Sequence, residues 1–268
     1  MKRISLFVAL SFIVLTSCKK DDVNTTIFKE TRVPFPTHNL TAYSIINNSK
    51  YLVVFETGLG NDHSVWNLKN IPSLISSLSD VLLYDRAGYG MSEKESSPRN
   101  IDKLRAELEN VINTSINGRK VILVGHSLGG MIIRDYAIKN PSKTAAILFI
   151  DPSHEFYNQP TQADEDMLYN SFYSAYGSSF GGTMEARELI EDSQYMNTIS
   201  DMPDVPVIVL TSMKEDASQN AADRQKWFDA HELLKNGVSD FTHITTTNSG
   251  HYIMVEEPEI VLTNLILL

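Results

Sequence analysis

The sequence predicts an α/β fold in which helices cover both faces of a mostly parallel sheet. Short, wholly apolar runs recur along the chain, and helix-length stretches separate them. Runs that are apolar throughout are typical of strands buried on both faces, and alternation with helices favours parallel pairing. The predicted strands are 41–46, 51–55, 81–84, 121–124, 146–150, 207–210 and 241–245, and the predicted helices are 101–116, 127–140, 221–235 and 257–268.

One segment, residues 152–204, breaks this alternation between the predicted strands 146–150 and 207–210. A structureless loop of that length is improbable in a compact domain, so we expect a small helical cap. The segment is rich in aromatic residues, which either pack the cap against the sheet or line a substrate site. They are Phe156, Tyr157, Tyr169, Phe172, Tyr173, Tyr176, Phe180 and Tyr195.

The N-terminus has the features of an export signal. A basic start, Lys2-Arg3, precedes an apolar run over 4–15 that is too short to span a membrane. Leu15-Thr16-Ser17-Cys18 resembles the lipobox of bacterial lipoproteins, in which the cysteine is acylated after cleavage. We therefore expect a signal peptide over 1–17, a lipid on Cys18, a tether over 18–30 and a folded domain over 31–268. The protein would be held at a membrane, on the periplasmic face or the cell surface; the alternative is a plain secretory signal.

Composition and spacing exclude several other functions. The formal net charge of −10 leaves no basic face for nucleic acid. Neither metal-ligand spacing nor a Gly-x-Gly-x-x-Gly turn occurs in the sequence, so we expect no metal and no cofactor.

The strongest motif is Gly125-His126-Ser127-Leu128-Gly129, in which Ser127 lies between a predicted strand and a predicted helix. A sharp strand-to-helix turn that exposes a serine needs neighbours without a Cβ two positions before and after it. A serine hydroxyl also needs a base to take its proton. His251, in a loop between the last strand and the last helix, is the best-placed histidine.

These motifs, with Glu56-x-Gly58-x-Gly60-x5-Trp66 and the turn from Asp85 to Ser92, resemble the α/β-hydrolase superfamily from about residue 50 onward. The resemblance implies Ser127 as nucleophile, His251 as base, and an oxyanion hole made by the amides of Leu128 and Leu59, with Gly58 as the alternative to Leu59. Asp85 and Arg86 are interpreted as structural residues that shape a turn beside the site.

The acid of the triad has two candidate positions. Asp151 follows the strand 146–150, and Glu215 and Asp216 follow the strand 207–210. The superfamily uses both places. Asp151 is favoured, because the usual Gly-x-x-Asp turn is absent before Asp216 and the spacing from Asp216 to His251 is long.

The predicted function is a serine hydrolase that cleaves a small or medium apolar carboxylic ester through an acyl-enzyme. The same residues serve thioester, amide or carbon–carbon hydrolysis. The alternative is a catalytically silent, lipid-anchored binding protein on the same fold.

Overall fold

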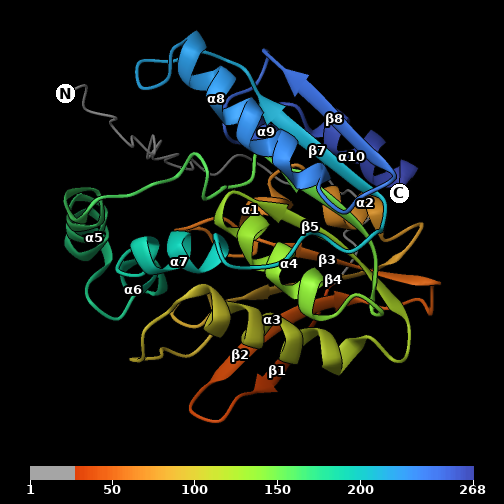
Figure 1. The fold of residues 1–268 in the computed structure, drawn as a ribbon. Helices are drawn as coiled ribbons and strands as arrows, with labels where there is room; N and C mark the ends of the chain where they lie inside the picture. The colour runs from red at the N-terminus through yellow and green to blue at the C-terminus, as the bar shows by residue number, and fades with distance from the viewer. Residues whose placement is uncertain (1–27) are drawn as a thin grey trace, which may run out of the picture.

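The computed structural model describes residues 28–268, and an eight-stranded sheet forms its centre (Figure 1). The strand order is β1-β2-β4-β3-β5-β6-β7-β8. The strands are β1 (Lys29–Pro34), β2 (Asn39–Ile45), β3 (Tyr51–Glu56), β4 (Asp80–Asp85), β5 (Lys120–His126), β6 (Thr144–Ile150), β7 (Val207–Ser212) and β8 (Phe241–Thr246). β2 pairs antiparallel with both β1 and β4, whereas the pairs from β4 through β3 to β8 are parallel.

Helices cover both faces of the sheet, as the apolar strands require. α3 (Ile101–Ser115) and α4 (Leu128–Lys139) contribute to one buried apolar cluster. On the other face lie α1 (Ser64–Asn67), α2 (Ile71–Ile75), α9 (Ile253–Glu256) and α10 (Pro258–Leu267). α8 (Ala221–Glu232) and the short 3₁₀ helix Leu233–Lys235 lie between β7 and β8. The predicted fold class is confirmed, and β1 is a strand that the sequence pattern missed.

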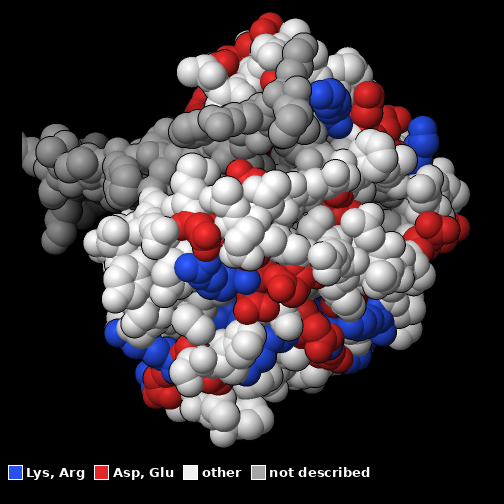
Figure 2. Space-filling model, turned by 60° about the vertical axis from the view of Figure 1, so that its left-hand side comes forward, with Lys and Arg blue, Asp and Glu red and all other residues white. Residues whose placement is uncertain are grey.

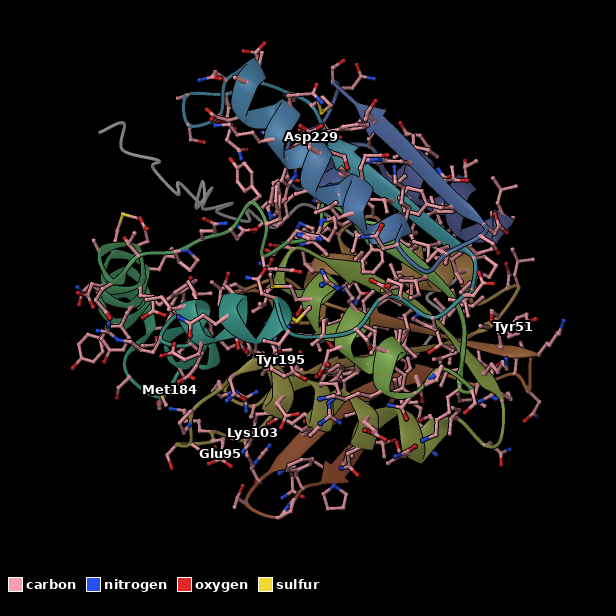
Figure 3. The ribbon with its side chains drawn as sticks, viewed as in Figure 1. Tyr51, Glu95, Lys103, Met184, Tyr195 and Asp229 are labelled. Carbon is pink, nitrogen blue, oxygen red and sulfur yellow. The ribbon has the colours of Figure 1, made fainter. Side chains whose placement is uncertain are left out.

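A helical cap joins β6 to β7, where the sequence predicts one. Its helices are α5 (Gln162–Tyr176), α6 (Gly181–Glu185) and α7 (Leu189–Met196). Figure 3 labels Met184 on α6 and Tyr195 on α7. The Tyr195 hydroxyl donates to Asp135 Oδ1 at 2.9 Å and accepts from Lys139 Nζ at 2.6 Å, and these contacts tie the cap to α4.

The cap aromatics mainly hold the cap together. Phe180 packs edge-on against Tyr89 at 4.8 Å between ring centroids, and also contacts Phe172 and Tyr176. Among the cap aromatics, Tyr157 alone lines one of the two cavities beside Ser127 that the described residues form. Of the two interpretations, the structural one therefore holds for most of these side chains.

The predicted signal peptide and Cys18 lie outside the described residues, and so does most of the predicted tether. Its last two residues, Lys29 and Glu30, lie in β1. Within residues 28–268 no helix has both the length and the apolar character needed to cross a bilayer. Figure 2 shows Lys and Arg side chains interspersed with Asp and Glu over the face in view.

Candidate active site

Ser127 lies at the turn between β5 and α4. Its backbone has φ 53° and ψ −124°, a conformation that residues with a side chain rarely adopt. The neighbouring glycines make the turn possible: a Cβ on Gly125 would lie 2.6 Å from Ile133 Cδ1, and one on Gly129 would lie 2.6 Å from the carbonyl oxygen of Glu56. The expected strand–turn–helix context of the motif is therefore present.

Asp151 and His251 meet although they are far apart in the sequence. His251 Nδ1 lies 2.7 Å from Asp151 Oδ2. Asp151 follows β6 directly with φ 43°, and it is fully buried. Its Oδ1 accepts two further hydrogen bonds, from Trp227 Nε1 at 2.7 Å and from the Ser212 amide at 2.9 Å. These donors fix the carboxylate, and the carboxylate orients the imidazole.

The pKa of Asp151 is lowered despite its burial. Burial alone raises the pKa of a carboxyl group, but the hydrogen bond and charge of His251 outweigh it, with a contribution from Trp227. Asp151 is therefore ionised at neutral pH and able to stabilise a positive charge on His251.

The alternative acids point elsewhere. Asp216 contacts Arg224 Nη2 at 3.2 Å and accepts from the Ser218 amide, and Glu215 accepts from the Ala221 amide. Of the three candidates, only Asp151 contacts His251 in the described structure.

The expected oxyanion residues border Ser127. Leu128 is the first residue of α4, and Leu59 lies in the loop after β3; both line one cavity with Ser127. A Cβ on Gly58 would lie 3.0 Å from Ser127 Cβ, so this loop runs directly beside the serine.

Arg86 holds the loop in place, a role that the motif alone did not reveal. Its guanidinium donates to the carbonyl oxygen of Thr57 at 2.8 Å and to that of Gly58 at 2.9 Å. Because a peptide unit is planar and trans, a bound Gly58 carbonyl turns the Leu59 N–H away from Arg86. Arg86 also pairs with Glu56 at 2.7 Å and with Glu185 of the cap at 2.8 Å, all three being buried.

His126, next to the nucleophile, has a structural contact. Its Nε2 donates to the carbonyl oxygen of His251 at 2.9 Å, and burial lowers its pKa to about 3. A neutral His126 therefore holds the loop that carries His251.

Two cavities meet at Ser127 and His251. The first, of about 70 Å³, lies under the cap and is mostly apolar. The second, of about 540 Å³, is more polar and includes Lys214, Asp216 and Trp227. In the described structure no hydrogen bond joins the Ser127 hydroxyl to the imidazole, a common state in unliganded enzymes.

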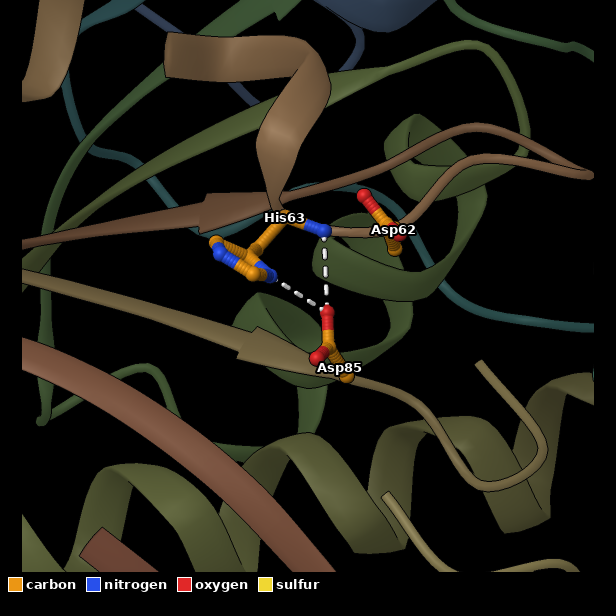
Figure 4. Close-up of side chains that lie close together, drawn as sticks. All are labelled: Asp62, His63 and Asp85. Atoms are coloured by element: carbon orange, nitrogen blue, oxygen red, sulfur yellow. Dashed lines mark hydrogen bonds and ion pairs between the residues drawn. The ribbon is translucent and has the colours of Figure 1, made fainter. Parts of the chain in front are cut away.

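A group of Asp62, His63 and Asp85 is the one described cluster with the spacing of metal ligands (Figure 4). Its atoms are already engaged. Asp85 Oδ1 accepts from the His63 amide and lies 2.7 Å from His63 Nδ1, whereas Oδ2 accepts from Tyr43 and the Met91 amide. The cluster therefore stabilises the turn after β4, in line with the structural interpretation of Asp85.

The arrangement of sheet, turn and cap matches a known family. Residues 51–197, more than half of the chain, match the model described as alpha/beta hydrolase fold. The chain belongs to this family.

The chain is also similar to curated relatives and to solved structures. YqjL of Bacillus subtilis (strain 168), an uncharacterized protein, is 24% identical over 80% of this chain and 81% of its own length. A human (lyso)-N-acylphosphatidylethanolamine lipase is 29% identical, over 50% of this chain and only 39% of the lipase. Carboxylesterase CesB of Bacillus subtilis has a TM-score of 0.64 at 18% identity, covering 89% of this chain and 90% of CesB.

Proposed function

We propose that this protein is a serine hydrolase that cleaves carboxylic esters. The observation that carries the proposal is the buried Asp151–His251 pair, with a 2.7 Å contact, on the wall of a cavity that the strained Ser127 also lines. Esterase and lipase relatives on the same fold support this reaction class.

In the proposed reaction, Ser127 Oγ attacks the ester carbonyl carbon while His251 Nε2 takes the hydroxyl proton. The amides of Leu128 and Leu59 stabilise the oxyanion, and a donor of this kind contributes about 3 kcal/mol to transition-state stabilisation. His251 then returns the proton to the leaving alcohol. Water, activated by His251, hydrolyses the acyl-enzyme and restores Ser127.

The apolar cavity under the cap is the proposed acyl site. Leu128, Met131 and Leu168 line it close to Ser127. The wider and more polar of the two cavities is the proposed path for the alcohol and for water, because it reaches the same serine from the side of Lys214.

The decisive experiment compares wild type with Ser127→Ala on p-nitrophenyl esters from acetate to laurate. We expect activity to fall by roughly 10⁴-fold or more in Ser127→Ala, and a fluorophosphonate probe to label only the wild type. If both proteins are equally inert to esters and probe, the silent binding protein becomes the better description.

We also propose that Cys18 carries a lipid that holds the protein at a membrane, with the periplasmic face and the cell surface both open. The support is the lipobox-like sequence before Cys18. Metabolic labelling of the full chain with radioactive palmitate in a Gram-negative host should mark the wild type and not Cys18→Ser. Unlabelled, freely soluble wild-type protein would contradict the anchor.

A further inference from the structure

The cavity under the cap contains one buried acid that the proposed reaction does not use. Asp192, on α7, lines this cavity together with Ser127 and is only 3% exposed. Its Oδ1 accepts a 2.7 Å hydrogen bond from the amide of Ile101, the first residue of α3. Its Oδ2 is buried and has no hydrogen-bond partner among the described residues.

The surroundings of Asp192 favour its neutral form. Burial, followed by the negative charges of Glu188, Glu185 and Glu191, raises its pKa well above the usual value for aspartate. The amide of Ile101, at the positive end of α3, is the group that opposes this shift. Since Oδ1 accepts from that amide, the acid proton resides on Oδ2, where it lacks an acceptor.

Most of the surface that the cavity wall presents is apolar, although polar side chains such as Asn158 also line it. Leu59, Met131 and Leu189 are among the apolar side chains that surround it. A buried donor without a partner is unfavourable, and a ligand that supplies the missing acceptor removes that penalty. A matching ligand is thus largely hydrocarbon and has one oxygen at the depth of Asp192.

We propose that Asp192 Oδ2 donates a hydrogen bond to an oxygen on the acyl chain of the substrate, so that esters of oxo- or hydroxy-substituted acids are preferred over plain fatty acid esters. This inference rests on the proposed ester hydrolysis at Ser127. Asp192 acts as a specificity residue and takes no part in the bond-breaking step.

The test measures kcat/KM for methyl octanoate and for its oxo derivatives, with the oxo group at successive carbons. At one position we expect wild type to prefer the oxo ester by roughly tenfold to a hundredfold. Asp192→Leu should reduce that ratio to about one, whereas Asp192→Asn should keep most of it, because an amide N–H replaces the acid O–H. Gln194→Leu, at an exposed position of the same helix α7, is the matched control and should keep the wild-type ratio.

A flat wild-type ratio at every position, or an unchanged ratio in Asp192→Leu, would overturn the inference. If Asp192→Leu does not fold, Asp192→Ala, which also lacks the donor, replaces it and should likewise bring the ratio to about one. Calorimetric binding of the same esters to Ser127→Ala gives a readout free of turnover. If wild type hydrolyses the esters with a flat ratio, only the role of Asp192 is refuted. If the protein binds the oxo esters preferentially but wild type hydrolyses none of them, only the proposed reaction is refuted.

Discussion

Asp151 and Asp192 are both buried carboxyl groups in the walls around Ser127, yet their pKa values shift in opposite directions. Asp151 has three donors, namely His251, Trp227 and the amide of Ser212. Asp192 has one backbone donor and lies among acidic residues of the cap. Burial is common to both, so the number and charge of the neighbours decide which acid is ionised.

The largest expected effect follows from removing the ionised acid. Asp151→Asn should lower kcat by about 10⁴-fold, because an amide cannot hold His251 in the required tautomer or stabilise its positive charge. Ester hydrolysis at neutral pH measures this loss. Asp216→Asn is the control and should stay near wild type; a large loss in Asp216→Asn with an active Asp151→Asn would reverse the assignment of the acid.

The acidic residues around Asp192 belong to the cap, and a buried ion pair between Glu185 and Arg86 ties the cap to the sheet. Glu185→Gln should lower the free energy of unfolding by roughly 3 kcal/mol, since it breaks a buried ion pair with Arg86. Chemical denaturation measures the change. The partly exposed cap pair of Asp166 and Arg187 provides the control: Asp166→Asn should change stability by less than about 1 kcal/mol. Equal effects of the two substitutions would contradict a special role for the buried pair.

A smaller effect is expected where Asp151 loses one donor and keeps the others. Trp227→Phe removes the 2.7 Å indole hydrogen bond to Oδ1, and we expect kcat to fall about tenfold, since a hydrogen bond to a charged group is worth about 1.5 kcal/mol or more. Trp66→Phe is the matched control, because the buried Trp66 indole has no hydrogen-bond partner in the described structure. An unchanged kcat in Trp227→Phe would show that His251 and Ser212 suffice.

A further contrast between the two acids concerns stability and pH. Folded wild type keeps the Asp192 proton at pH values where the unfolded chain, with a pKa of about 3.9, has released it. Unfolding then releases a proton, so this group lowers stability as pH rises above that value until the folded pKa is reached. Asp192→Asn has no such loss, and its Tm relative to wild type should increase as the pH rises above about 4. A Tm difference independent of pH would mean that Asp192 is ionised in the fold.

Local patterns predicted much of this molecule. The apolar runs predicted the seven strands from β2 to β8, and the glycines around Ser127 predicted the turn because they act within a few residues. β1 was missed because its charged, exposed residues lack the apolar pattern of a buried strand.

Contacts between distant residues could not be predicted in the same way. Trp227 meets Asp151 across 76 positions and Glu185 meets Arg86 across 99, and no local pattern encodes either pairing. The unpartnered oxygen of Asp192 depends on where α7 packs against α3, which only the folded chain defines.

The two edge strands of the sheet differ in how they resist association with other molecules. β1 carries Lys29, Glu30 and Arg32 and ends at Pro34, features that discourage another strand from pairing with it. β8 has no Lys, Arg, Asp, Glu or Pro, and Thr242 and Thr245 are exposed along it. Aggregation at high concentration would therefore begin at β8, and a lysine at Thr242 or Thr245 is the direct remedy.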